Sequence, residues 1–238
     1  MRVLIACEES QAVTIEMRRL GHEAYSCDLQ ECSGGHPEWH IQCDVIPLIN
    51  GNCEFQTVDG TRHIINGKWD LLIAHPPCTY LSNVCTRGFS LKCEPAEKVV
   101  DRWKNRAYAV AFFMYFVLAD CDHIAVENPV GFMNTAYRKP DQIIDPYMFA
   151  KSIDDTENYV TKRTCLWLKG LKPLTRNDLP RPILPKRKTK SGKLKSICWE
   201  EQVTTDMAKN RSKTFSGIAK AMAEQWAGVC EKEADNEQ

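Results

Sequence analysis

The chain has 238 residues, of which 43% are hydrophobic, enough for one domain with a sizeable core. Lys and Arg total 31 and Asp and Glu total 31, so overall charge gives no indication of an anionic partner, and local charge must carry that argument. The first residues resemble a strand rather than a signal peptide, and no later apolar run is long enough to cross a membrane. We therefore expect a cytoplasmic protein that keeps its 12 cysteines as free thiols.

The first half of the chain alternates short apolar runs with one helical pattern. Residues 2–6 and 23–27 predict strands, and residues 10–20 predict a helix between them. A hairpin is expected around residues 59–60, and residues 69–74 predict a further strand, too short for a helix and continuously apolar.

The second half continues this alternation. A helix is expected over 95–118, strands over 124–126 and 160–168, and a closing helix over 214–229. Strands that alternate with helices in this way predict an α/β fold with a doubly wound, mostly parallel sheet.

We divide the chain into a core (1–170), a short insert (171–209), a closing segment (210–230) and an acidic tail (231–238). Prolines in the insert lead into a basic loop, which would attract phosphates, although a solvated surface loop is an equally good interpretation. The basic residues that we select as phosphate contacts are Lys186, Arg187, Lys188 and Lys190.

Two short motifs follow the predicted core strands directly. Pro76-Pro77-Cys78 comes after residues 69–74, and Glu127-Asn128-Pro129 comes after residues 124–126. Open α/β sheets form their sites at the carboxyl ends of their strands. A thiol and a carboxyl group are therefore expected at the same edge of the sheet.

This pair suits covalent attack on a pyrimidine ring. The Cys78 thiolate would add to carbon 6, and Glu127, as a carboxylic acid with a raised pKa, would protonate ring nitrogen 3. Pro76 and Pro77 would hold the thiol in position, and Asn128 would brace the loop. A buried structural cysteine and a glutamate in an ion pair are the simpler alternatives for each residue taken alone.

Together these segments resemble the DNA cytosine-C5 methyltransferase family, most closely its compact, phage-type members, and the resemblance extends from Arg2 to about Trp226. It implies a Rossmann-like fold of the class I S-adenosylmethionine-dependent methyltransferase type, with Cys78 as the nucleophile and Glu127 as the ring-activating acid. Residues 161–164 resemble the family's basic motif, and residues 210–219 resemble its closing motif. The substrate residues that the comparison suggests are Pro77, Ser82, Asn128, Pro129, Lys162 and Arg163, in addition to the four basic residues of the insert.

The resemblance also implies S-adenosylmethionine as the cofactor and a bacterial or phage-infected cell as the location. The loop after the first strand lacks the glycines that are common in such proteins. Asp28 is placed to accept hydrogen bonds from the ribose hydroxyls, and Asp44 could accept one from the adenine amino group. Each aspartate could instead cap a helix or a turn. The full set that we assign to the cofactor is Glu9, Ser10, Gln11, Asp28, Leu29, Asp44, Val45 and Pro76.

We expect no metal, although the spacing of Cys32, His36, His40 and Cys43 would permit a zinc site. The short insert predicts minimal recognition of DNA sequence around a flipped cytosine, and no obligate protein partner or membrane association is evident. Two alternatives stay open: the same ring chemistry on a free cytosine nucleotide or RNA, and a catalytically silent nucleic-acid-binding module.

Overall fold

The computed structural model describes residues 1–184, 186–188, 192–196 and 214–229. It is an α/β structure with a seven-stranded, mostly parallel mixed sheet in the order β3-β2-β1-β6-β7-β9-β8, compatible with a Rossmann-like fold. The strands of this sheet are β1 (Arg2–Ala6), β2 (Glu23–Asp28), β3 (His40–Gln42), β6 (Leu71–Ala74), β7 (Ile124–Pro129), β8 (Gln142–Ile144) and β9 (Thr164–Lys169).

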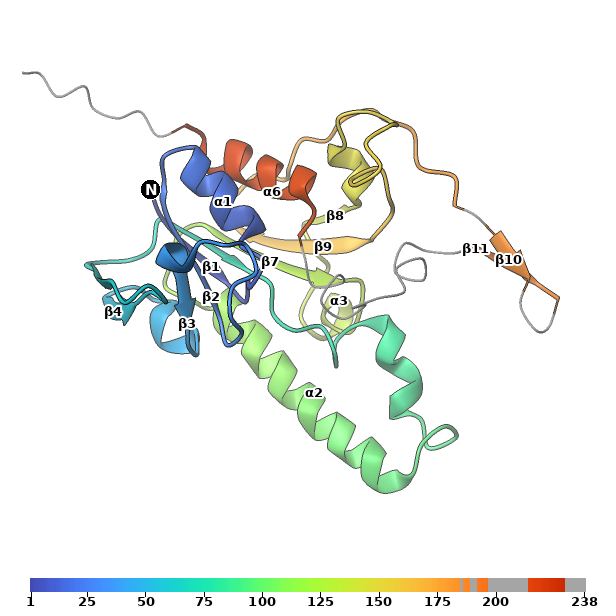
Figure 1. Ribbon diagram of the computed structural model, residues 1–238. Coiled ribbons are helices and arrows are strands. Elements are labelled where there is room, and N and C mark those ends of the chain that lie inside the picture. Colours follow the sequence, from blue (N-terminus) through green and yellow to red (C-terminus); the bar gives the residue numbers. More distant parts are fainter. Residues whose placement is uncertain (185, 189–191, 197–213, 230–238) are drawn as a thin grey trace, which may run out of the picture.

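Helices cover both faces of the sheet (Figure 1). They are α1 (Ala12–Arg19), α2 (Ala96–Val117), the short α3 (Met133–Ala136) and α6 (Ser216–Met222), which continues into a π-helical turn at Ala223–Ala227. Turns of 3-10 helix occupy Pro37–Trp39, Ile46–Leu48, Asn83–Phe89 and Pro146–Phe149.

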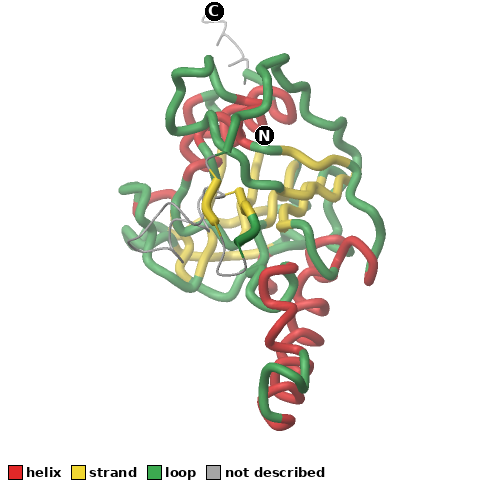
Figure 2. Tube along the Cα trace, turned by 90° about the vertical axis from the view of Figure 1, so that its right-hand side faces the viewer, coloured by secondary structure: helices red, strands yellow, loops and turns green. Residues whose placement is uncertain are grey.

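The pleat of β1 explains how the two faces are divided. Val3 and Ile5 belong to the cluster that contains residues of α1 and α6, whereas Leu4 belongs to the cluster that contains Phe113 and Phe116 of α2. Both faces of the central strands are therefore buried, which is why these runs are hydrophobic without alternation. Helix α2 extends well beyond the sheet (Figure 2).

The predicted hairpin at residues 59–60 is confirmed as β4 (Cys53–Gln56) paired with β5 (Arg62–Ile65). The strand predicted over 160–168 begins only at Thr164 and is antiparallel to both of its neighbours. The predicted basic loop is wrong in part, because Lys186–Lys188 forms β10 and pairs with β11 (Leu194–Ser196) in a separate two-stranded hairpin. Figure 1 shows this hairpin away from the main sheet.

The strand order reverses between β1 and β6, which are parallel neighbours that lead to opposite halves of the sheet. Such a reversal leaves a crevice at the carboxyl ends of the strands, where open α/β sheets bind ligands. The segments that follow β1, β2, β6 and β7 all reach this edge, so the site is sought there. Within the described part of the chain, no helix is long and apolar enough to cross a membrane.

Candidate active site

The loop that carries the predicted nucleophile, Cys78, begins where β6 ends, and we call it the nucleophile loop. Main-chain bonds run from the amides of Leu81 and Ser82 to the carbonyl of Cys78, at 3.0 and 2.9 Å, so a tight turn starts at the cysteine. Cys78 is exposed and free. Pro77 is also exposed, whereas Pro76 is buried beneath the turn.

This loop is bonded to the segment that follows Glu127. The buried Asn128 donates its Nδ2 to the carbonyl of Pro76 at 2.7 Å, and the Phe132 amide donates to the Leu81 carbonyl at 2.7 Å. A Cβ on Gly131 would stand 2.1 Å from that same carbonyl oxygen, so only glycine permits this approach. The predicted bracing role of Asn128 agrees with these contacts.

A residue of α2 also supports the nucleophile loop, and sequence reasoning did not identify it. Arg106 is 8% exposed and donates Nε to the carbonyl of Tyr80 at 2.8 Å. Its guanidinium lies 3.4 Å from the ring centroid of Phe89. An arginine within an amphipathic helix carries no sequence signal that it will turn inward.

Glu127 lies within β7, opposite Leu166 of β9. His75 Nδ1 donates to its Oε2 at 3.1 Å, and Lys162 and the Thr164 hydroxyl act on the same carboxyl group. Burial raises the pKa of Glu127, but the His75 hydrogen bond and charge, with the contributions of Lys162 and Thr164, outweigh it, and the net pKa is lowered. The expectation of a raised pKa is therefore wrong for the protein without its substrate.

Although Cys78 as a whole residue is exposed, desolvation of its sulfur by the surrounding chain and the nearby Glu127 charge raise the pKa of the thiol, while Lys162 acts in the opposite direction. The Cys78 sulfur is thus close enough to Glu127 for the two groups to influence each other. Both pKa shifts favour a thiol and a carboxylate in the free protein, whereas the predicted chemistry would require a thiolate and a carboxylic acid.

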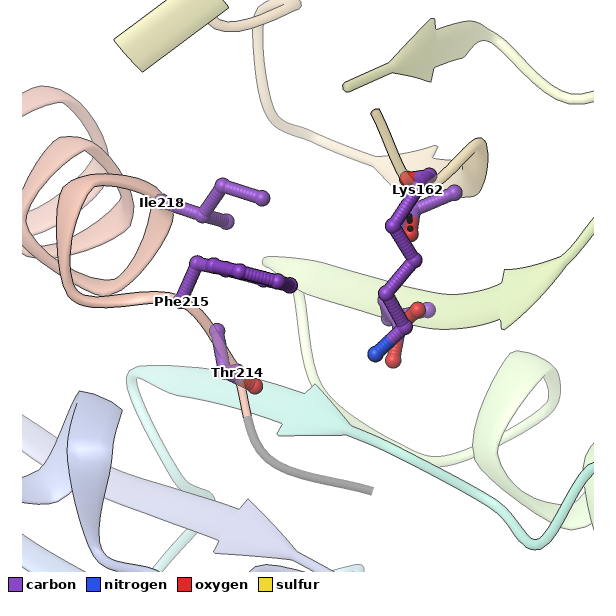
Figure 3. A pocket seen from close by; sticks show the side chains of 6 residues that line it. Lys162, Thr214, Phe215 and Ile218 are labelled. Atoms are coloured by element: carbon purple, nitrogen blue, oxygen red, sulfur yellow. Dashed lines mark hydrogen bonds between the residues drawn. The ribbon is translucent and has the colours of Figure 1, made fainter. Parts of the chain in front are cut away.

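A recess beside Glu127 is lined by Lys162, Thr164, Thr214, Phe215 and Ile218. Figure 3 shows Lys162 on one side of it, and Thr214, Phe215 and Ile218 on the other. Lys162 Nζ lies 5.6 Å from the centroid of the Phe215 ring. The part of the predicted closing motif that is described therefore lies beside Glu127, together with Lys162 of the predicted basic motif. Arg163 is exposed.

The loop after β1 takes unusual backbone conformations. Cys7 and Gln11 have φ angles of 59° and 58°, in the left-handed region that usually favours glycine. The Glu8 carboxylate accepts the amides of Val13 and Thr14 at 2.6 and 3.3 Å and thereby caps α1. Residues with such strained backbone conformations cluster at ligand sites. In this loop, Cys7 and Gln11 adopt the conformations that glycines would usually provide.

Two of the predicted cofactor residues hold a neighbouring loop. Gln11 is fully buried and bonds both the amide and the carbonyl of His36, so its side chain serves the loop structure. Glu9 accepts the Ser33 hydroxyl at 2.5 Å through Oε2. Ser10 is half-buried at the start of α1.

The two aspartates lie at the ends of β2 and β3 as predicted, and both also cap turns. Asp28 accepts the Gln30 amide at 2.9 Å, and Asp44 accepts the Ile46 amide at 3.1 Å. Burial, followed by the charges of Asp28 and Asp44, raises the pKa of Cys7, which indicates that the two carboxylates flank this residue at the crevice. Leu29 is 74% exposed and Val45 is buried.

The crevice contains buried polar atoms that have no hydrogen-bond partner among the described residues. They belong to segments at the carboxyl ends of three adjacent strands and are Glu9 Oε1, His75 Nε2 and Asn128 Oδ1. Buried polar atoms without partners are rare in folded proteins and indicate that a polar ligand or water completes them. With Asp28 and Asp44 at the same edge, the residues present fit a polar nucleoside-type cofactor.

The cysteines of the described segments are all free thiols, as expected. His40 bonds Ser26 and the Gln30 carbonyl, and His36 stacks on Trp39 at 3.9 Å, so both rings are engaged within the loop. Across residues 1–184 and the other described segments, no group of three or more His, Cys, Asp or Glu side chains is arranged to hold a metal ion.

On the β10–β11 hairpin, Lys186 and Lys188 are exposed. Lys190 lies outside the described residues, and Arg187 is described only as the middle residue of β10. Ser82 forms an isolated bridge with Gly131, and Pro129 ends β7, so both lie at the same edge as Cys78.

Comparison with known proteins adds no relative to these observations. No family model matches the chain, and a search of curated proteins found no match. The functional argument therefore depends on the site itself.

Proposed function

We propose that the chain is a methyltransferase that modifies carbon 5 of cytosine in DNA, with S-adenosylmethionine as the methyl donor. The observation that supports this most is the pairing of Cys78 with Glu127 at one sheet edge. Their strands β6 and β7 are parallel neighbours, and the loops that follow are bonded to each other through Asn128 and Phe132. A nucleophilic thiol beside a carboxyl group is what activation of a pyrimidine ring requires.

The residues would act in a defined order. Cys78 Sγ bonds to carbon 6, and the electrons of the C5–C6 double bond move toward ring nitrogen 3, which takes a proton from Glu127. Carbon 5 then takes the methyl group of bound S-adenosylmethionine, which leaves as S-adenosylhomocysteine. Transfer of the C5 proton to solvent water restores the C5–C6 double bond and expels the Cys78 thiolate, and ring nitrogen 3 returns its proton to Glu127. The positive charge of Lys162 favours the thiolate.

Glu127 must gain a proton before it acts, since its pKa is lowered in the protein alone. A neutral ring placed against the carboxyl group would remove water from it, and this desolvation favours the protonated form. Base binding and proton uptake are therefore linked in this scheme.

Bound S-adenosylmethionine would supply the electrophilic methyl carbon. Asp28 and Asp44 would hold its ribose and adenine, and the Glu9 oxygen that has no partner within the described part of the chain would face the same ligand. On the DNA side, the exposed Lys186 and Lys188 would contact phosphates, and the target cytosine would leave the duplex stack to reach Cys78.

The test uses duplex DNA with 5-fluorocytosine at the target position, in the presence of S-adenosylmethionine. Fluorine cannot leave as a cation, so a denaturation-resistant adduct should accumulate and peptide mapping should find it on Cys78. Cys78→Ser should form no adduct, whereas the control Cys93→Ser, another exposed thiol, should form it normally.

Transfer of tritiated methyl groups to cytosine without an adduct would contradict the covalent mechanism. An equal reaction with the 5-fluorocytosine mononucleotide would identify a nucleotide rather than DNA as the substrate. Absence of methyl transfer to either substrate would overturn the proposal.

A further inference from the structure

His75 is a buried residue that the proposed reaction does not yet use. It is the first residue after β6, and its amide donates to the carbonyl of Ala6 at the end of β1 at 2.9 Å. Alternation along β6 and β7 puts His75 on the same sheet face as Glu127, the face that α1 and α6 cover. The side chains of His75 and Glu127 are 5% and 20% exposed, and the ring bonds the carboxylate at 3.1 Å.

The groups around Glu127 come from several elements. Lys162 and Thr164 approach from the start of β9, Cys78 from the nucleophile loop, and the α6 segment contributes the uncharged side chains of Thr214, Phe215 and Ile218. The Glu127 charge also acts to raise the pKa of the Cys165 thiol on β9. On the far side of the ring, the buried Glu8 interacts with His75 through charge and is held by the start of α1.

We propose that His75 is a positioning residue for Glu127: its Nδ1–H holds one carboxylate oxygen, fixes the plane of the carboxyl group against the base, and keeps the group ionised until cytosine enters. This inference rests on the proposed function. Among the described residues, the ring Nε2 has no partner, so the hydrogen bond from Nδ1 to Glu127 is the side-chain contact that orients the ring.

The proton balance follows from this arrangement. His75 keeps the proton on Nδ1 throughout and forms no covalent bond with the substrate. As the base binds, the Cys78 thiol releases its proton to solvent and Glu127 takes one from solvent. Glu127 gives its proton to ring nitrogen 3 when the Cys78–C6 bond forms. It recovers that proton when the C5–C6 double bond is restored, and returns it to solvent on product release.

The pH dependence has a definite sign. Because the pKa of Glu127 is lowered, its protonated form disappears at a lower pH than it would without His75. The alkaline limb of the pH–rate profile, where the rate falls as pH rises, therefore also lies at a lower pH. Removing the donor raises the pKa of the carboxyl group and moves that limb upward, even while poor orientation slows the reaction.

Two substitutions separate these effects. His75→Phe keeps a ring but has no donor, and adduct formation on 5-fluorocytosine DNA should slow by on the order of tenfold to a hundredfold at its optimum, with an alkaline limb at higher pH. His75→Asn offers an amide donor near the position of Nδ1 and should recover most of the rate and the wild-type limb. The matched control is His123→Phe, since His123 is exposed at the opposite end of β7.

If the phenylalanine variant does not fold, His75→Gln serves instead, because its longer side chain carries the amide past the position of Nδ1. Equal loss in the donor and donor-free variants, or an alkaline limb that does not move, would reduce His75 to a packing residue and overturn the inference.

A titration without substrate tests His75 independently of activity. In protein labelled with 13C at glutamate carboxyls, the signal that disappears in Glu127→Gln identifies Glu127, and its titration midpoint should rise in His75→Phe. An unchanged midpoint overturns the inference. A raised midpoint in a protein whose wild type forms no DNA adduct counts against the proposed function alone.

Discussion

Different kinds of contact stabilise the two sides of the carboxyl edge of the sheet. On the half that carries Cys78 and Glu127, which we propose as the catalytic half, main-chain bonds, the buried Asn128 and Gly131, which has no room for a Cβ, join the loops after β6 and β7. On the half that we propose binds the cofactor, which we call the cofactor half, Glu8 caps a helix, Asp28 caps a turn and Gln11 holds the loop at His36. Backbone-held positions tolerate little displacement, whereas side-chain caps allow local adjustment. The catalytic half should therefore lose activity more steeply when altered.

The largest effect is expected at Glu127. Glu127→Gln keeps the shape of the side chain but removes the acid, and adduct formation should slow by about a hundredfold to ten-thousandfold. The rate of adduct formation on 5-fluorocytosine DNA measures this effect. Glu54→Gln, an exposed strand glutamate paired with Arg62, is the control and should leave the rate unchanged. A Glu127→Gln variant with the wild-type rate would remove the carboxyl group from the mechanism.

Gly131→Ala tests the link between the two catalytic loops. The new Cβ would collide with the Leu81 carbonyl, and relief of this contact shifts the segment that follows Cys78. We expect methyl transfer to fall by roughly a hundredfold, because small displacements of reacting groups have large effects. Thermal unfolding should reveal a stability loss of about 1–3 kcal/mol.

Gly60→Asn is the control for this substitution, because Gly60 lies in the β4–β5 turn and a Cβ there meets only Gln56 at 3.7 Å. Normal activity in Gly131→Ala would mean that the two loops move independently.

On the cofactor half, Asp28→Ala should weaken binding of S-adenosylmethionine by about one to two orders of magnitude, the effect of losing a charge-assisted hydrogen bond. Calorimetry measures the affinity. Asp59→Ala removes a comparable turn cap in the β4–β5 hairpin and should leave the affinity unchanged. Unchanged binding in Asp28→Ala would assign this aspartate to the turn alone.

The smallest effect is expected at the β10–β11 hairpin. Replacing Lys186 and Lys188 with alanine should weaken DNA binding without altering sequence preference and lower the salt slope by roughly one per lost contact. Binding isotherms at several salt concentrations provide this slope. The control pair is Lys68→Ala with Lys220→Ala, which removes lysines that form surface ion pairs elsewhere. Equal slopes for both pairs would make the hairpin an ordinary surface element.

Local pattern alone was enough to predict the central strands, helix α2 and the β4–β5 hairpin. Continuous apolar runs and turn residues are properties of neighbouring positions, so no distant contact is needed to recognise them. The same reasoning placed Cys78 and Glu127 at a shared edge, since carboxyl ends of parallel strands meet there. The direction of β9 was not predictable in this way, because antiparallel pairing with β7 is a tertiary choice.

The protonation state of the site was decided by the tertiary structure. Sequence reasoning assigned Glu127 a raised pKa, but His75 and Lys162, which are distant in the chain, reach the carboxylate and reverse the direction. Gln11 was likewise predicted to bind the cofactor, but its side chain is hydrogen-bonded to the main chain of His36. A pKa or a hydrogen bond sums over neighbours in space, and a sequence specifies those neighbours only after the chain has folded.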